Sequence, residues 1–115
     1  MTDCLFCRIL AGEIPAREVA RAELAMAFHD VNPQAPTHVL VVPKTHLSGP
    51  AAADSESGEQ IFGPVLRLAV QVASQLGLAE RGYRLVLNQG PDGGQSVDHL
   101  HVHVLGGRRM KWPPG

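Results

Sequence analysis

Residues 98–105 (DHLHVHVL) alternate between polar and aliphatic side chains, and this alternation constrains the fold more than any other feature of the chain. Successive side chains of a β-strand point to opposite faces. His99, His101 and His103 would therefore project from one face, about 6.6–7 Å apart, while the aliphatic residues between them face a core. Polar-out alternation is common on half-exposed strands, but three aligned side chains that titrate near neutrality predict a functional face on a structural strand.

The remaining pattern predicts an α+β domain with an antiparallel sheet. The β-branched run 38–42, bounded by prolines, is typical of a strand buried on both faces, and we expect it at the sheet centre. A helical stripe covers 61–76, and Pro64 would either start or kink that helix. The other expected elements are a short helix at 4–11 ended by Gly12, a hairpin of 18–20 and 24–28, a strand at 83–88 and a glycine-rich loop at 89–96.

The length, composition and net charge of the chain exclude several classes of protein. A chain of 115 residues with 44% apolar and 18% charged residues predicts one folded domain, 1–115. Its net charge of -1 supplies no basic surface for nucleic acid. No stretch approaches the roughly 18 apolar residues of a membrane helix, and the charges of Asp3, Arg8 and Glu13 argue against a secretory signal. We therefore expect a cytoplasmic protein with no nucleic-acid or membrane partner.

Two kinds of chemistry fit three aligned histidines. A His-x-His pair with a third histidine can bind a catalytic metal and keep one position open for water. Alternatively, one imidazole is a nucleophile, since a neutral histidine with a pKa of about 6.5 is basic enough to attack phosphorus. The loop 93–96 (GGQS) directly upstream can point backbone N–H groups and a hydroxyl at an anion, which favours phosphate over metal.

The chain resembles the histidine triad (HIT) superfamily, and in particular its Hint branch of histidine triad nucleotide-binding proteins. The motifs that carry the resemblance are 27–30 (AFHD), 32–38 (NPQAPTH), 42–44 (VPK), 92–97 (DGGQSV), 99–105 (HLHVHVL) and 105–115 (LGGRRMKWPPG). They run in order over essentially the whole chain. The resemblance implies a HIT-like fold, with a five-stranded antiparallel sheet and two helices. It also implies a homodimer with a ten-stranded sheet, in which the tail 106–115 reaches toward the partner subunit.

The resemblance further implies a purine nucleoside phosphoramidase. Such an enzyme cleaves the P–N bond of adenosine or guanosine 5'-phosphoramidates, including AMP joined to a lysine amine, and releases AMP or GMP. His101 would attack the α-phosphorus and form a nucleotidyl-histidine intermediate. His103 would bind the phosphate and handle the proton, while His99 and His38 orient His101. This catalysis would need no cofactor.

The same resemblance implies which residues hold the nucleotide. Asp30 would bind the ribose hydroxyls, although an Asp at this position also suits a turn. The other implied residues are Asn88, Gly94, Gln95 and Ser96 at the phosphate, Phe6, Ile9, Phe28, Val31 and Leu40 in an apolar cleft for the base, and Trp112 from the partner's tail. The apolar residues also suit an ordinary core, and Trp112 a frayed tail.

Cys4 and Cys7 have the spacing of a metal-ligand pair but supply only half of a zinc site. Some bacterial HIT proteins with a similar pair complete a structural zinc site with a histidine after the Pro-Lys of the central strand and with the first triad histidine. Those positions are His46 and His99 here. The resemblance thus implies a structural zinc, separate from catalysis, and the alternative is two half-buried cysteines beside a surface histidine.

Three other functions remain open on the sequence. The first is a dinucleoside polyphosphate hydrolase of the fragile histidine triad branch, against which the 112–115 (WPPG) ending and the 93–96 loop argue. The second is a non-catalytic nucleotide-binding or scaffold protein, for which the presence of His101 is unfavourable. The third is a hydrolase that uses the triad as metal ligands, which loss of activity with a chelator would reveal.

Overall fold

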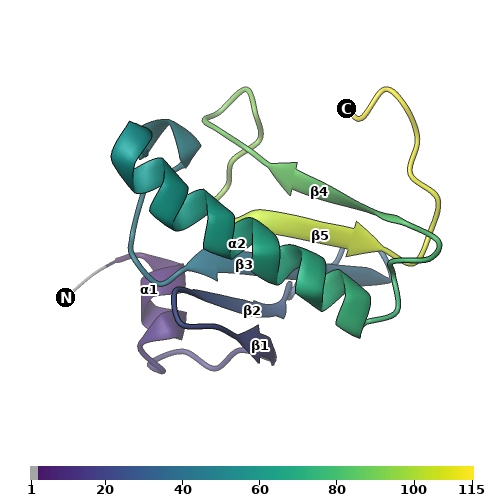
Figure 1. Cartoon of the computed structure of the whole chain (residues 1–115), viewed down its shortest axis with the longest axis horizontal. Coiled ribbons are helices and arrows are strands. Elements are labelled where there is room, and N and C mark those ends of the chain that lie inside the picture. Colours follow the sequence, from purple (N-terminus) through teal and green to yellow (C-terminus); the bar gives the residue numbers. More distant parts are fainter. Residues whose placement is uncertain (1–2) are drawn as a thin grey trace.

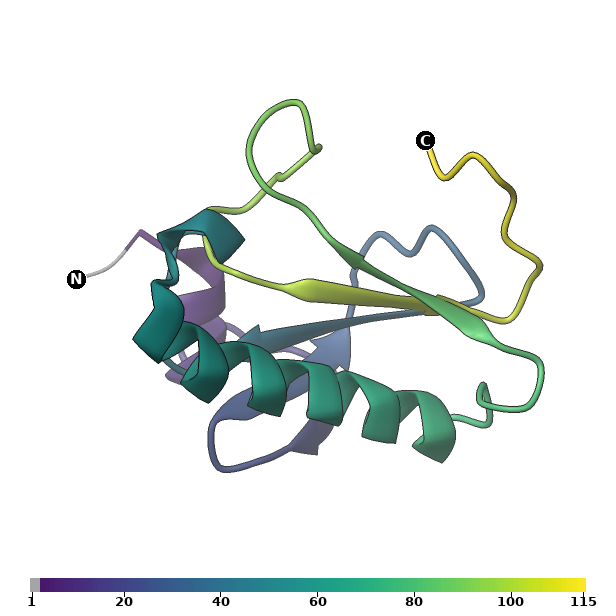
Figure 2. The ribbon, with the colours of Figure 1, turned by 45° about the horizontal axis from the view of Figure 1, so that its top comes forward.

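The computed structural model describes residues 3–115, which form one antiparallel five-stranded sheet with a helix on each face (Figures 1 and 2). The strands lie in the order β1-β2-β3-β5-β4. The elements are α1 (Leu5–Leu10), β1 (Glu18–Arg21), β2 (Ala25–His29), β3 (Thr37–Pro43), the 3₁₀ helix η1 (Pro50–Ala52), α2 (Ser55–Gln75), β4 (Tyr83–Leu87) and β5 (Val102–Gly106). The predicted α+β class, with a five-stranded antiparallel sheet and two α-helices, is confirmed.

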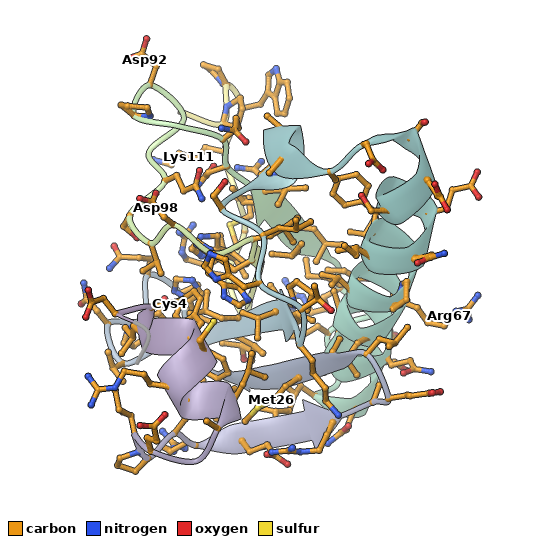
Figure 3. The ribbon with its side chains drawn as sticks, turned by 90° about the vertical axis from the view of Figure 1, so that its left-hand side faces the viewer. Cys4, Met26, Arg67, Asp92, Asp98 and Lys111 are labelled. Carbon is orange, nitrogen blue, oxygen red and sulfur yellow. The ribbon has the colours of Figure 1, made fainter. Side chains whose placement is uncertain are left out.

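Strand β3 is the centre of the sheet, as its apolar run predicts. It pairs with β2 on one side and β5 on the other. Val39 and Val41 are fully buried against α2, while Leu40 and Val42 face the opposite side and pack with α1. Figure 3 shows the sheet between the two helices, with Cys4 of α1 on one side and Arg67 of α2 on the other.

Helix α2 begins earlier than its apolar stripe predicts. It starts at Ser55 and contains Pro64, so the expectation that Pro64 could begin the helix is wrong. A capping box explains the early start: the Asp54 carboxylate accepts hydrogen bonds from the N–H groups of Glu56 (3.0 Å) and Ser57 (2.7 Å), and Ser57 Oγ accepts one from Asp54 N–H (3.1 Å). These contacts stabilise two turns that bury little apolar surface.

Strand β5 is shorter than the alternation predicts. It begins at Val102, so His99 and His101 precede it rather than lie within it. Leu100 instead donates its backbone N–H to Leu47 O (2.7 Å), which draws this segment away from regular pairing. The predicted division of faces holds nonetheless, because Leu100 packs in the α2-side core while the imidazoles of His101 and His103 lie together, 5.0 Å between ring centroids.

The imidazole face is covered rather than open. Helix α1 lies over it, so that His99 is 0% and His101 4% exposed. Gly12, with φ of +78°, follows the end of α1 as the sequence predicts. Within residues 3–115, no helix has the length and apolar character needed to cross a membrane.

Candidate active site

The candidate site is a row of imidazoles on the α1 side of the sheet, where Phe6 of α1 packs against His99 and His101. His38 comes from the start of β3 and His103 from β5, while His99 and His101 come from the segment that leads into β5. The rings of His38 and His103 lie 5.1 Å apart between centroids, and those of His101 and His103 lie 5.0 Å apart. The structure thus brings together the rings of His38, His101 and His103, while the ring of His99 packs against Phe6 and His46.

His101 is held by a backbone carbonyl. Its Nδ1 lies 2.7 Å from His99 O, which can only accept a hydrogen bond, so Nδ1 carries the proton. In the neutral ring, Nε2 then keeps its lone pair. Phe6 packs edge-on against the same ring, with the centroids 5.2 Å apart and the planes at 81°. The arrangement fixes the ring and gives it one defined nucleophilic atom.

His38 and His103 form a directed chain of hydrogen bonds. Gln34 donates its backbone N–H to His38 Nδ1 (3.0 Å), so the proton of neutral His38 resides on Nε2. That N–H faces His103 Nδ1 at 2.8 Å and also lies 3.3 Å from Asp30 Oδ2. His103 accepts on Nδ1, and therefore its own proton lies on Nε2 and is available as a donor.

Burial keeps this chain uncharged. Desolvation lowers the pKa of His103 to about 4, with smaller contributions from His101 and His38, and the Asp30 carboxylate opposes the shift. Desolvation also lowers the pKa of His38, again opposed by Asp30. At neutral pH both rings are therefore hydrogen-bond donors and acceptors rather than cations.

Asp30, His38 and His103 also lie close enough to resemble a metal site. Binding through His38 Nε2 would require the proton of this ring to move to Nδ1, which would then oppose the Gln34 N–H at 3.0 Å. Two facing donors are unfavourable, and so the backbone favours the hydrogen-bonded chain over metal binding. This contact argues against Asp30, His38 and His103 as a metal site.

A second cluster joins the amino terminus to the triad, and its atoms fit zinc. Its ligand atoms, Cys4 Sγ, Cys7 Sγ, His46 Nδ1 and His99 Nδ1, all lie within 4.8 Å of one another. In four pairs of these ligand atoms, the two atoms are 3.1 to 3.5 Å apart. A tetrahedral zinc with usual bond lengths has ligand atoms about 3.3–3.8 Å apart, so the separations agree within a few tenths of an ångström. The cluster is the one that the resemblance implies.

The surroundings of this cluster prepare it for a cation. His99 Nε2 donates to Pro43 O (3.1 Å), which leaves Nδ1 unprotonated toward the cysteines, and desolvation lowers the pKa of the His99 ring. Burial and the adjoining Cys4 raise the pKa of the Cys7 thiol, a penalty that a bound cation reverses. Cys4 is also the N-cap of α1 and accepts the Cys7 N–H at 3.4 Å. These residues could hold a structural zinc that ties α1 to the sheet.

The glycine-rich loop is held largely by itself. The backbone N–H groups of Gly94 and Gln95 donate to Pro91 O and Gly90 O, and the Gln95 side chain bonds Gly90 N–H, Ser48 O and Val97 O. Gln95 is therefore a brace of the loop. Gly93 allows the close turn, because a Cβ there would lie 2.6 Å from Gln89 O. Of the predicted phosphate residues, Ser96 is exposed and Asn88 half-buried.

The residues predicted for the base separate into two groups. Phe6, Ile9, Phe28 and Leu40 pack together beside the imidazoles and are 9% exposed or less. Val31 and Trp112 are instead 99% and 82% exposed. Asp30 lies at the junction, where one carboxylate oxygen caps a turn by accepting Asn32 N–H (2.8 Å) and the other faces His38.

Sequence reasoning missed three groups that orient the site. These are the backbone N–H of Gln34 and the carbonyl oxygens of Pro43 and His99. Every residue other than proline carries both an N–H and a C=O, and so no sequence signal marks the ones that are used.

Comparisons with known proteins identify the family to which this fold and this row of imidazoles belong. Residues 11–110 match the HIT domain family. The chain is 52% identical over 113 residues to the 14 kDa zinc-binding protein of Zea mays, which covers 96% of this chain and 87% of the relative. It is 47% identical over 113 residues to the adenylylsulfatase HINT1 of Arabidopsis thaliana, with 96% and 76% covered.

A solved structure supports the same assignment. The HIT family hydrolase of Legionella pneumophila matches with a TM-score of 0.94 at 47% identity, over 98% of this chain and 100% of that chain. The chain therefore belongs to the HIT family, and its likeness to a plant HINT1 protein agrees with the resemblance to the Hint branch.

Proposed function

We propose that this protein is a nucleoside phosphoramidase that cleaves the P–N bond of purine nucleoside 5'-phosphoramidates, with His101 as the nucleophile. The observation that carries the proposal is the 2.7 Å hydrogen bond from His101 Nδ1 to His99 O, which leaves Nε2 as the attacking atom. The solved relative named as a HIT family hydrolase is consistent with hydrolysis.

The reaction would proceed in two displacements. In the first, His101 Nε2 forms a bond to the α-phosphorus, the P–N bond breaks, and the departing amine takes a proton from His103 protonated in the complex. In the second, water attacks the phosphorus and gives a proton back to His103, the His101–phosphorus bond breaks, and the nucleoside monophosphate leaves. His103 Nε2–H would donate to the phosphoryl oxygens, and the negative charge of a bound phosphate would raise the pKa of His103 toward a value useful for proton transfer.

The nucleotide would lie along this row. Asp30 would bind the ribose hydroxyls, and the Ser96 hydroxyl with the Asn88 amide would complete the phosphate site. The Gly94–Gln95 segment would act mainly by holding Ser96 in place, since its hydrogen bonds are made within the loop. Phe6, Ile9, Phe28 and Leu40 would form the apolar floor beneath the base, with Val31 at its exposed rim.

Hydrolysis of a fluorogenic adenosine 5'-phosphoramidate tests the proposal. We expect turnover by the intact protein, loss of turnover in His101→Ala, and no direct dependence on added metal. An inert intact protein, or a fully active His101→Ala variant, would contradict the assignment and favour a nucleotide-binding protein without catalysis.

A second candidate substrate is adenylyl sulfate, because the Arabidopsis relative is named an adenylylsulfatase. The two substrates share the adenylyl group but differ in the leaving group: an amine needs a proton to depart, and sulfate does not. His103→Gln should therefore reduce kcat for the phosphoramidate more than kcat for adenylyl sulfate. The ratio of kcat for the phosphoramidate to kcat for adenylyl sulfate, measured in the intact protein and in His103→Gln, identifies the leaving group to which the site is suited.

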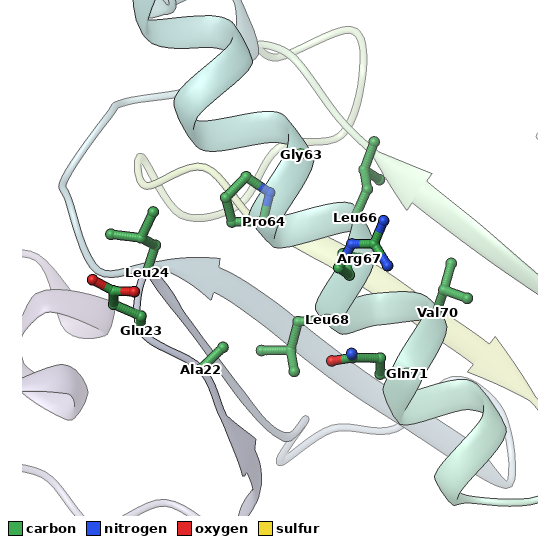
Figure 4. A pocket seen from close by; sticks show the side chains of 10 residues that line it. All are labelled: Ala22, Glu23, Leu24, Gly63, Pro64, Leu66, Arg67, Leu68, Val70 and Gln71. Atoms are coloured by element: carbon green, nitrogen blue, oxygen red, sulfur yellow. The ribbon is translucent and has the colours of Figure 1, made fainter.

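The functional unit would be a homodimer joined through β4. This strand is at the sheet edge, and its outer side has no strand partner among residues 3–115. Leu66 and Val70 of α2 are 40% and 49% exposed, and Figure 4 shows both on the same side of the helix. Joining two β4 edges would extend the sheet to ten strands and cover these side chains. Light scattering should report a dimer, and Leu66→Glu with Val70→Glu a monomer.

The Cys/His cluster would hold a structural zinc. The Zea mays relative is named a zinc-binding protein, and four of the separations between the ligand atoms here, 3.1 to 3.5 Å, are close to those of a tetrahedral zinc site. Bound zinc would link α1 to the sheet and would take no part in the reaction. Elemental analysis should find about one zinc per chain in the purified protein and none in Cys4→Ser with Cys7→Ser.

A further inference from the structure

His99 belongs to two sites at once. Its Nδ1 lies 3.3 Å from Cys4 Sγ and 3.1 Å from His46 Nδ1, within the Cys/His cluster. Its backbone oxygen accepts the Nδ1–H of His101 at 2.7 Å. The residue is 0% exposed, and Pro43 O holds the remaining ring nitrogen. The side chain of His99 thus lies in the Cys/His cluster, while its backbone carbonyl holds His101, the proposed nucleophile.

Phe6 makes a second connection. It lies between Cys4 and Cys7 in the chain, so the two sulfur atoms bracket it at the start of α1. Its ring packs edge-on against His99, with centroids 5.8 Å apart, and against His101, with centroids 5.2 Å apart. Phe6 is 3% exposed, and so its ring cannot move without disturbing both imidazoles.

We infer that the Cys/His cluster sets the orientation of His101, through the His99 carbonyl on one side and through Phe6 on the other. Phe6 is then a positioning residue for the nucleophile as well as part of the apolar floor. A filled cluster fixes His99 and α1 together, and this restricts rotation of the His101 ring. Small misplacements of a nucleophile cost large factors in rate, so occupancy of a site that takes no part in the chemistry would still change kcat.

The first test follows the His101 Nδ1 proton by nuclear magnetic resonance. In the zinc-loaded protein labelled with ¹⁵N, we expect a sharp signal from this proton that exchanges slowly with water. Removal of zinc with EDTA should broaden the signal and accelerate its exchange by at least about tenfold, while the backbone spectrum shows that the sheet remains folded. An unchanged signal in folded, zinc-free protein would overturn the inference.

A second test keeps the metal and removes only the ring of Phe6. Phe6→Leu should bind zinc as the intact protein does, yet show the broadened His101 signal. Leu10→Ala is the matched control, because Leu10 lies on the same helix and packs in the same apolar cluster but has no aromatic ring to pack against His99 or His101. If the His101 signal of Phe6→Leu matches that of the intact protein, Phe6 has no positioning role. This variant also keeps the inference testable if zinc removal unfolds the chain.

The kinetic consequence rests on the proposed function. For phosphoramidate hydrolysis, Phe6→Leu should lower kcat by roughly 10- to 100-fold with KM little changed, and Leu10→Ala should leave both near their original values. A rise in KM alone would mean that Phe6 acts on the base and not on His101. Failure of the proposed function would appear as an inactive intact protein with the spectroscopic coupling still present, so the two failures are distinguishable.

Discussion

His103 has its charge state set mainly by burial. Desolvation is the largest cause of its lowered pKa, and the nearby rings of His101 and His38 act in the same direction. A pKa of about 4 means that the ring is neutral throughout the physiological range. His103 and His38 are therefore neutral imidazoles whose protons are fixed by hydrogen bonds.

This charge state can be measured directly. The ring protons of His103 should titrate with a midpoint near the pKa of about 4, and those of His38 below the ordinary value of about 6.5. His103→Gln identifies the resonance by removing it. A midpoint for His103 at or above the ordinary value would show that the ring is solvated or paired with a carboxylate instead of buried.

The same shift makes folding stability depend on pH. Because the folded-state pKa of His103 is lower than the unfolded-state value, its contribution is fully present above about pH 6.5 and is lost as pH falls toward about 4. Thermal melts of zinc-loaded protein should therefore show a steeper loss of stability over this window than melts of His103→Gln. Parallel curves would contradict the shift.

At the scale of elements, the start of α2 depends on its cap. Asp54→Ala removes the acceptor for the N–H groups of Glu56 and Ser57 and should lower the free energy of unfolding by about 1 kcal/mol. Glu59→Gln, an exposed change in the same region, is the control and should have little effect. Urea denaturation measures both. Equal stabilities for Asp54→Ala and the control would mean that the first turns contribute nothing to folding.

The cap also explains what the sequence could and could not predict. The apolar stripe marks α2 only where it packs on the sheet, from Ile61 onward, while residues 55–60 bury little apart from Gly58 and so carry no periodicity. Strand alternation placed the three triad histidines on one side correctly, because side-chain direction follows from period two. The alternation could not predict the hydrogen bonds to the backbone that fix the tautomers of His99 and His101. These bonds depend on the path of the chain before β5, where Leu100 donates its N–H to Leu47 O.

The loop before β3 is connected to the start of the tail. Arg108 Nη2 donates to Gln34 O (3.2 Å), and the backbone N–H of Gln34 in turn donates to His38 Nδ1. Arg108→Gln should loosen this loop and lower kcat about fivefold, the equivalent of one hydrogen bond of about 1 kcal/mol. Arg109→Gln removes the same charge from the neighbouring residue and should have a smaller effect. Equal effects of the two variants would point to charge alone.

At the scale of the whole molecule, the tail is directed along the open sheet edge. Arg84 of β4 donates to Lys111 O (2.9 Å) and lies 5.9 Å from the centroid of the Trp112 ring. Trp112 remains 82% exposed in the single chain, as a side chain used by a neighbouring subunit would be. The proposed dimer would bring this tail toward the other active site.

Mixing two defective variants tests that arrangement. Trp112→Ala and His101→Ala should each be impaired alone. If the tail acts on the partner's site, each heterodimer of the two variants contains one site with an intact His101 and an intact Trp112. Random mixing in equal amounts makes about half of the dimers heterodimers, so activity per chain should recover to about a quarter of the original. Recovery requires subunit exchange, which a tagged pull-down verifies. No recovery after verified exchange would place Trp112 in its own subunit's site.

The cluster that joins Cys4 to His99 spans 95 positions of sequence, and this separation orders events during synthesis. Helix α1 leaves the ribosome before the residues that receive it are made. Strand β5 lies between β3 and β4, so β4 also has no neighbour until β5 is complete. Before β5 is made, the nascent chain can therefore assemble β1, β2 and β3 with α2 packed on them, but not the complete sheet. In the proposed zinc site, capture of the cation would have to wait until His99 has left the ribosome.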